Sequence, residues 1–263
     1  MAALRCLLPP SAGDIRAAAR GEMLALALER VLDEKVEVRV ARDYLGLIDA
    51  LLDSRAEMAW VPAAVLSRVE TVRPGTARAI YKMRRANRST YRSAVLVHAR
   101  SGRWTTGDLE GANAGWVDPL SLSGGILAKR LLGEHGVTLG EERYYGSHPA
   151  ALEALLNREV DVAAVSTSSA VDVDLHTALV RNVGSAGAHE IRALAYSQVV
   201  PTDAFVLTDA MDEGRAAGVE QRVFGGSALR LALETEGFEP TLAEEYSVLD
   251  ALLPHDFALR QVG

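Results

Sequence analysis

The sequence predicts an α/β protein made of two doubly wound, three-layer lobes with a ligand cleft between them. Short β-like runs alternate with helical stretches over residues 1–60, and the same alternation is repeated over residues 100–195. This alternation is typical of parallel strands joined by crossover helices. The chain has 263 residues, 49% of them hydrophobic and 24% charged, which is sufficient for two lobes of ordinary domain size.

The first unit has the order strand, helix, strand, helix, strand. Its first helix places apolar residues such as Met23, Leu28 and Val31 at helical spacing. Its second strand alternates valine with charged residues, which is typical of a half-exposed strand. Ligands of such an open sheet bind at the carboxyl ends of its strands. We expect strands at 4–8, 36–40 and 58–61 and helices at 15–32 and 44–54.

The second unit follows residue 93 and has the same alternation. A short helix is expected to end at the Leu-Glu-Gly run 109–111. Strands are expected at 93–98, 114–117, 143–145 and 160–165, and longer helices at 124–135 and 148–157. The tail 202–263 is predicted to be helical apart from one strand at 205–207.

The chain is expected to return to the first lobe near Ser197. The first lobe is therefore predicted to be discontinuous, with residues 1–92 plus 199–263, and the second lobe to contain residues 93–198. No stretch rich in Gly, Ser or Pro separates the two units. Strands rather than a flexible tether are expected to join them.

The charge balance is acidic and uneven. The formal net charge is −7, from 28 basic and 35 acidic residues, which makes the chain a poor generic binder of nucleic acid. The segment 73–103 nevertheless contains nine Lys and Arg residues and no acidic residue. This basic segment is a solvated face, an electrostatic funnel for an anionic ligand or a docking face for an acidic partner.

The start of the chain and its apolar runs bear on its location. The first ten residues lack the basic start and the apolar stretch of about 7–15 residues that secretory signal peptides have. The longest apolar runs fall far short of the ~20 residues that a bilayer span requires. We expect no membrane span, and a chain that is cytoplasmic if Met1 is the native start or periplasmic if a leader has been removed. The single cysteine, Cys6, cannot form an internal disulfide.

The most informative segment is 116–125, which reads Trp-Val-Asp-Pro-Leu-Ser-Leu-Ser-Gly-Gly. Unpaired N–H groups and the positive end of the helix dipole converge at the start of the helix that follows. An oxyanion fits such a site, and its candidate ligand-binding residues are Ser121, Leu122, Ser123 and Gly124. Capping of the helix by Ser121 or Ser123 explains the same residues without a ligand.

Two more loops bring polar side chains to the same edge of the second sheet. The run 146–149, Gly-Ser-His-Pro, places His148 at a helix start, where a neutral or protonated imidazole can donate to an anion. The run 165–169, Val-Ser-Thr-Ser-Ser, adds hydroxyl groups beginning with Ser166. Further candidates lie next to strand ends of the first lobe or before the strand that crosses between lobes: Ser11, Tyr44, Trp60 and Tyr91. The apolar run around Trp60 also predicts a core position for it.

Enzymatic signatures are absent from the sequence. It contains no G-x-S-x-G, H-E-x-x-H or G-x-x-x-x-G-K-[ST] motif and no Cys and His spacing that binds a metal. A pocket of hydroxyls, one imidazole and helix N-termini is better equipped to bind an oxyanion than to transform it. We therefore predict a small oxyanion as ligand, with no catalytic residue, no metal and no cofactor.

Several motifs occur in order along residues 57–207: Glu-Met-Ala-Trp at 57–60, Tyr-Arg-Ser at 91–93, Asp-Leu-Glu-Gly at 108–111, the segment 117–124, the run 146–155 and the strand 160–165. Together they resemble the phosphate-, phosphite- and phosphonate-binding proteins of ABC importers, which have the type 2 periplasmic-binding-protein fold. The resemblance implies two lobes that close on an anion and pass it to the membrane subunits of an importer. It also implies that residues 121–123, Tyr91 and His148 hold the phosphonate group and that Tyr44 covers the ligand.

The sequence departs from the family pattern at two places. Ser166 replaces the acidic residue that the family commonly has after the strand 160–165, and residues 197–201 read Ser-Gln-Val-Val-Pro instead of Ser-Pro-Pro-x-Pro. Both departures argue against an aminoalkylphosphonate as ligand. Two alternatives on a similar scaffold are a cytoplasmic enzyme resembling chorismate dehydratase and a ligand-sensing module.

Overall fold

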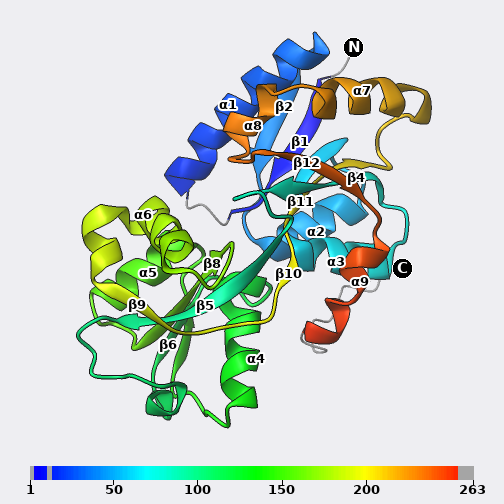
Figure 1. The fold of residues 1–263 in the computed structure, drawn as a ribbon. Coiled ribbons are helices and arrows are strands. Elements are labelled where there is room, and N and C mark those ends of the chain that lie inside the picture. The colour runs from blue at the N-terminus through cyan, green and yellow to red at the C-terminus, as the bar shows by residue number, and fades with distance from the viewer. Residues whose placement is uncertain (1–2, 11–13, 254–263) are drawn as a thin grey trace.

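The structure is a computed structural model that describes residues 3–10 and 14–253. It contains two β-sheets, each covered by helices on both faces (Figure 1). The predicted fold class, two three-layer α/β lobes, is confirmed. Within the described part of the chain, no helix has the length and apolarity that a bilayer crossing requires.

The first sheet has six strands in the order β12-β4-β11-β3-β1-β2. They are β1 (Leu4–Leu8), β2 (Val36–Val40), β3 (Met58–Val61), β4 (Ala77–Arg84), β11 (Ala204–Thr208) and β12 (Gly237–Thr241). β1 pairs in parallel with β2 and β3, as crossover helices require. β11 runs antiparallel between β3 and β4, so the C-terminal part of the chain completes the first lobe.

Helices pack on both faces of the first sheet. One face shares its apolar core with α2 (Tyr44–Leu52), α3 (Ala63–Val72), α9 (Glu244–Ser247) and the short 3-10 helix η3 (Asp250–Leu252). The other face packs against α1 (Asp14–Leu32), α7 (Glu213–Gly225) and α8 (Ala228–Ala232). Consecutive residues of β1 alternate between the two cores, with Cys6 in one and Leu7 in the other, as the period of a strand requires.

The second sheet has the order β10-β5-β8-β6-β7, and β9 also pairs with β5. Its strands are β5 (Thr90–His98), β6 (Ala114–Trp116), β7 (Glu142–Tyr144), β8 (Val162–Thr167), β9 (Ile191–Tyr196) and β10 (Val200–Pro201). α5 (His148–Leu156) and α6 (Asp172–His189) pack on one face, and α4 (Leu127–Glu134) and the 3-10 helix η1 (Thr106–Leu109) on the other. β6 lies between β7 and β8, parallel to both, and ends directly before the segment predicted to bind an anion.

The chain passes between the sheets at two places. It leaves the first sheet after β4 and returns to it between β10 and β11. β10 still belongs to the second sheet, because Val200 pairs with Tyr91 of β5. The predicted lobe boundaries at 92/93 and 198/199 lie near these two passages, and the assignment of individual residues to each lobe stays a prediction.

The elements α3, β4, α6 and β9 are not among those expected from the sequence, and two further features differ from the expectation. The tail contains two strands of the first sheet and not one, because β12 adds a strand at the edge of that sheet. Its sequence, Gly-Phe-Glu-Pro-Thr, lacks the apolar alternation of a strand. The edge position tolerates Pro240, and Glu239 forms an ion pair with Lys82 of β4. The helix expected at 124–135 begins two residues earlier, with one turn of π-helix, η2 (Leu122–Ile126).

Candidate functional site

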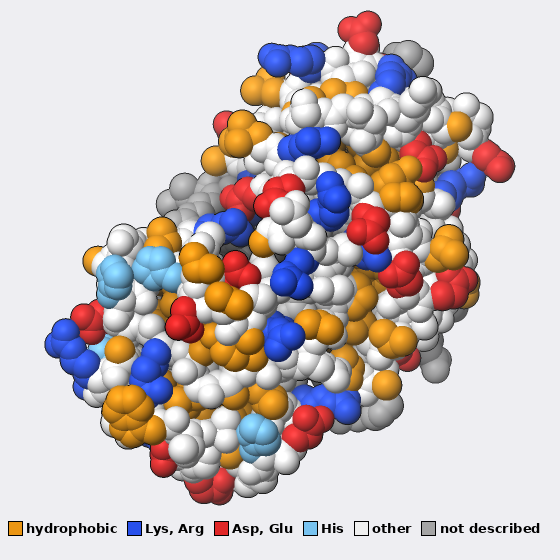
Figure 2. All heavy atoms as spheres, viewed as in Figure 1, with side chains coloured by type: hydrophobic (Ala, Val, Ile, Leu, Met, Phe, Trp, Pro, Cys, Tyr) orange, Lys and Arg blue, Asp and Glu red, His pale blue; other side chains and the backbone are white. Residues whose placement is uncertain are grey.

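A cavity of about 770 Å³ lies between the two lobes, and residues of both lobes line it. Figure 2 shows acidic and basic side chains gathered where the lobes meet. Gly124 does not line the cavity, and Ser11 lies outside the described residues. The other eight residues predicted from the sequence line it: Tyr44, Trp60, Tyr91, Ser121, Leu122, Ser123, His148 and Ser166.

The turn η2 brings Ser121 and Ser123 to the cavity. Ser121 caps the turn, because its Oγ accepts a hydrogen bond from the N–H of Gly124 at 3.2 Å. A Cβ atom on Gly124 would lie only 2.3 Å from Cγ2 of Val117, so the absence of a side chain lets the turn pack against the segment before it. Ser121 therefore caps the turn and lines the cavity, whereas Gly124 shapes the turn without reaching the cavity.

Ser123 and His148 lie next to each other in the cavity wall. Oγ of Ser123 is 3.4 Å from Nε2 of His148, and the hydroxyl of Ser93 donates to the carbonyl of Ser123 at 2.7 Å. His148 begins α5, directly after the capping residue Ser147. Burial lowers the pKa of His148 to about 4. Of the two protonation states that the sequence leaves open, the structure favours the neutral imidazole at pH 7.

Because the folded protein holds His148 neutral, its stability is expected to fall as the pH is lowered from about 6.5 to 4. The unfolded chain takes up a proton near the ordinary histidine pKa of about 6.5, whereas the folded chain does so only near about 4. This difference contributes up to about 3 kcal/mol to the free energy of unfolding, and the contribution is lost over that pH range.

Urea unfolding of the protein at a series of pH values measures this loss. His148→Gln is expected to flatten the profile between pH 4 and 6.5, because the variant has no imidazole to protonate in the unfolded state. The matched control is the exposed His176, whose replacement by Gln should leave the profile of the wild type unchanged. Parallel profiles for the wild type and His148→Gln would contradict the prediction.

Tyr91 of β5 and Tyr44 of α2 add phenol groups to the cavity. Burial raises the pKa of Tyr91 well above 10, so its hydroxyl stays protonated and can donate a hydrogen bond. Tyr44 is 3% exposed, and its backbone N–H donates to the carboxylate of Asp118 in the second lobe. Leu120 and Leu122 of the second lobe are buried in the apolar core that includes α2. The two lobes therefore pack directly against each other at this part of the cavity.

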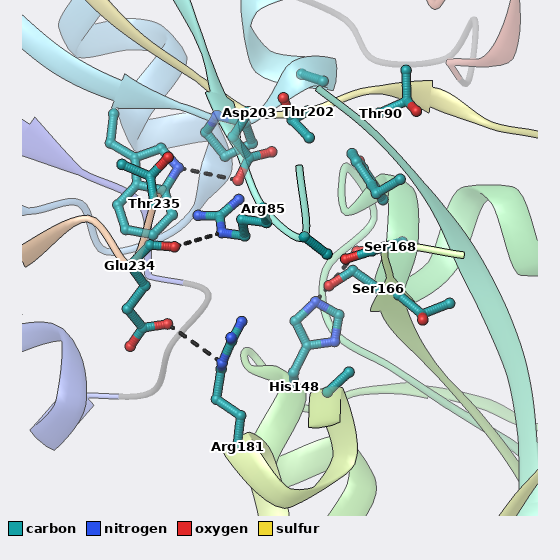
Figure 3. Close-up of a pocket in the computed structure, with 18 of the residues that line it drawn as sticks. Arg85, Thr90, His148, Ser166, Ser168, Arg181, Thr202, Asp203, Glu234 and Thr235 are labelled. Atoms are coloured by element: carbon teal, nitrogen blue, oxygen red, sulfur yellow. Dashed lines mark hydrogen bonds and ion pairs between the residues drawn. The ribbon is translucent and has the colours of Figure 1, made fainter. Parts of the chain in front are cut away.

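Trp60 lies at another part of the cavity and is 5% exposed, in agreement with the core position predicted for it. Its indole N–H donates to a carboxylate oxygen of Asp203 at 3.1 Å (Figure 3). The guanidinium groups of Arg20 and Arg85 lie over its ring, with Cζ 5.1 and 5.5 Å from the ring centroid. Burial raises the pKa of Asp203, and the positive charge of Arg85 opposes this rise.

Most of the charged residues of the cavity are not found by sequence analysis. Their positions follow no local motif, because they come from α1, α6, α8, the passage after β4, and the segments before β11 and β12. They are Arg20, Arg85, Asp174, Arg181, Asp203, Arg230, Glu234 and Glu236. The single sequence signal is the basic segment 73–103, to which Arg85 belongs.

The basic segment itself divides into two parts. Among its nine Lys and Arg residues, all of them described, Arg85 alone lines the cavity. Several of the others form ion pairs outside it, including Arg73 with Asp209 and Arg100 with Glu190. The alternative of a surface of solvated, paired charges therefore describes most of the segment, and only Arg85 is placed to attract an anionic ligand.

One ion pair joins the two lobes at the cavity. Arg181 of α6 lies in the second lobe, and its Nε is 3.7 Å from Oε2 of Glu234, which follows α8 in the first lobe (Figure 3). Glu234 also pairs with Arg20 of α1. Because the partners belong to different lobes, the Arg181–Glu234 pair forms only when the lobes lie close together.

The cavity contains the kinds of group that can bind an anion. Residues with hydroxyl groups, a neutral imidazole and a protonated phenol line it, and such groups can donate hydrogen bonds. Within residues 3–10 and 14–253, no three His, Cys, Asp or Glu side chains are grouped so that they could hold a metal ion.

Comparison with solved structures supports the fold. A binding-protein component of an ABC phosphonate transporter from Pseudomonas aeruginosa has a TM-score of 0.80 at 15% identity, over 95% of this chain and 85% of that one. PhnD1 of Prochlorococcus marinus, solved with methylphosphonate, has a TM-score of 0.81 at 13% identity, over 95% and 96%. A Xanthomonas citri protein solved with ATP has a TM-score of 0.70 at 17% identity, over 95% and 96%.

The family is shown by the sequence itself. A sequence model of the family described as "ABC transporter, phosphonate, periplasmic substrate-binding protein" matches residues 8–246, which is most of the chain. The match extends beyond residues 57–207, which carry the resemblance in the sequence analysis, and it confirms that resemblance. This chain therefore belongs to the family of periplasmic substrate-binding proteins of ABC phosphonate transporters.

Proposed function

We propose that this chain binds a phosphonate, phosphate or phosphite between its lobes and delivers it to the membrane subunits of an ABC importer. The observation that carries the proposal is the convergence of five donor residues on one wall of the cavity: Tyr91, Ser121, Ser123, His148 and Ser166. We refer to these five residues as the oxyanion wall. Because the family is periplasmic, we also propose that the chain acts on the outer side of the cytoplasmic membrane.

The oxyanion wall suits a tetrahedral phosphorus group. Its residues come from β5, η2, α5 and β8, so donors approach the ligand from several directions. Each phosphoryl oxygen accepts more than one hydrogen bond, and bonds to a charged acceptor are stronger than those between neutral groups. The N–H groups at the start of η2, which continues directly into α4, add the positive end of a helix dipole. The methylphosphonate complex of PhnD1 is consistent with such a ligand.

Isothermal titration calorimetry with phosphate, phosphite, methylphosphonate and 2-aminoethylphosphonate tests the proposed function. We expect binding of at least one of the first three ligands, with one ligand per chain. Weak or absent binding of 2-aminoethylphosphonate is expected because Ser166 stands where the family commonly has an acid. If none of the four ligands bound, the proposed function would be wrong.

Loss of the inter-lobe ion pair is expected to speed ligand release. Arg181→Gln removes the ion pair with Glu234. The side chains of Arg181 and Glu234 are 50% and 39% exposed, so the effect is limited to about 1 kcal/mol, or about fivefold in the dissociation rate. Stopped-flow measurement of release at increasing ionic strength checks this. The wild-type rate should rise toward that of the variant as salt screens the pair.

The control for this variant is Arg130→Gln. Arg130 of α4 forms an exposed ion pair of similar kind with Glu134, but both residues lie on one helix of one lobe. Its replacement should leave the rate of release and its salt dependence unchanged. Equal rates for wild type and Arg181→Gln at low salt would show that the Arg181–Glu234 pair does not hold the lobes together.

A further inference from the structure

The cavity is larger than a one-carbon phosphonate needs. Its volume of about 770 Å³ lies in the range of about 300–1,000 Å³ found for pockets that hold drug-sized ligands. The Arg181–Glu234 pair already joins the lobes across it, so the volume is not that of two widely separated lobes. Space therefore remains beside a phosphonate group bound at the oxyanion wall.

That space is lined by arginines together with acidic residues. We use the term arginine side for Arg20, Arg85, Arg181 and Arg230, none of which belongs to the oxyanion wall. Figure 3 shows Arg85 and Arg181 to the left of His148 and Ser166. The cavity thus has neutral donors on one side and both guanidinium and carboxylate groups on the other.

The acidic residues near the arginine side are engaged by donors of the protein. Glu236 accepts the backbone N–H groups of Ala86 and Asn87 at 2.9 and 2.7 Å. Glu234 pairs with Arg20 and Arg181, and Asp203 accepts the indole N–H of Trp60. These carboxylates therefore have donors of the protein itself as partners.

Two arginines on this side keep donors for a ligand. Arg85 donates Nε–H to the carbonyl of Glu234 at 3.1 Å and Nη2–H to the carbonyl of Leu233 at 3.4 Å, which uses two of the five N–H groups of a guanidinium. Arg230 is exposed, and its side chain has no hydrogen-bond or ion-pair partner among the described residues. The arginine side thus offers more unused donors than unused acceptors.

We propose that the natural ligand carries, besides its phosphonate or phosphate group, a second anionic oxygen group, a carboxylate or another phosphoryl group, which Arg85 and Arg230 bind. The inference rests on the proposed function, since it takes the oxyanion wall as the site of the first group. A planar guanidinium matches both kinds of oxyanion through paired hydrogen bonds. An alkyl group in the same place would leave these donors without acceptors.

Three phosphonates of matched length test the inference by calorimetry: propylphosphonate, 3-phosphonopropionate and 3-aminopropylphosphonate. We expect 3-phosphonopropionate to bind about 10- to 100-fold more tightly than propylphosphonate, as one or two charge-assisted hydrogen bonds imply. Equal affinity for these two ligands would overturn the inference and leave the proposed function intact. Tightest binding of the amine would also overturn it and would assign the space to Asp203. Failure of all three, and of phosphate, phosphite and methylphosphonate, would refute the proposed function itself.

Variants locate the second group. Arg230→Gln, at an exposed position where folding is not at risk, and Arg85→Met should each reduce the preference for 3-phosphonopropionate over propylphosphonate by about fivefold or more. Arg88→Gln is the matched control, because Arg88 lies in the same turn as Arg85, is exposed and does not line the cavity. An unchanged preference in both Arg230→Gln and Arg85→Met would overturn the inference. An equal loss of affinity for both ligands would place the phosphonate group itself at the arginines, and this too would overturn it.

Discussion

Replacing Ser121 and Ser123 together by alanine is expected to weaken binding of the phosphorus oxyanion at least tenfold while the protein still folds. The change removes two hydroxyl donors to a charged acceptor, each worth about 1.5–3 kcal/mol. Ser121 also caps η2, so the free energy of unfolding should fall by about 0.5–2 kcal/mol. Calorimetry and urea unfolding on the same variant measure both effects.

Single variants separate capping from binding. Ser123 lies beside His148 and is not the cap, so Ser123→Ala should lower affinity with little loss of stability. The matched control is Ser147→Ala, because Ser147 caps α5 by accepting the N–H of Ala150 but does not line the cavity. It should lower stability and keep the affinity. If the double variant lost stability and bound an established ligand as well as wild type does, Ser121 would be a cap alone and neither serine would bind the ligand.

Gly124→Ala is expected to have the largest effect on stability among single changes near the cavity. The added Cβ would lie 2.3 and 2.7 Å from Cγ2 and Cβ of Val117 and 2.8 Å from Oγ of Ser121, distances that force the turn to move. Such overpacking costs about 1–3 kcal/mol of unfolding free energy. Because the turn also positions Ser121 and Ser123, the affinity for the oxyanion should fall in parallel.

Gly125→Ala is the matched control for this variant. Its added Cβ would meet no atom closer than 3.5 Å, which is ordinary contact, and alanine is favoured over glycine in a helix. Its stability should equal or exceed that of wild type. The packing argument would be wrong if the two alanine variants unfolded at the same urea concentration.

The general position of the site was predictable because it follows from chain direction. Ser121 and His148 follow β6 and β7, Ser166 lies at the carboxyl end of β8, and these three strands are parallel neighbours. Their carboxyl ends meet at one edge, so residues far apart in sequence line one cavity. Their roles in binding stay predictions until the variants above are measured.

The charged residues of the cavity could not be predicted in this way. Arg181 and Glu234 come together because two lobes face each other, and no local pattern encodes the distance between lobes. Asp203 lies in the short passage back to the first sheet, where a polar residue also fits a surface turn. The strand β12 could not be predicted for a related reason. An edge strand that contains proline and a paired glutamate has no apolar alternation.

The place of β11 in the first sheet has a consequence for the order of folding. β4 has β11 and β12 as its neighbours, and both come from the last quarter of the chain. While the chain is being synthesised, β1, β2 and β3 can pair early, but β4 has no partner in this sheet until residues 204–208 have been made. Strands β5 to β9 are contiguous in sequence, so the second lobe has all of them once residue 196 is present. The second lobe can thus complete the pairing of these strands before the first lobe can. At that point of synthesis the first sheet still lacks its central strand, β11.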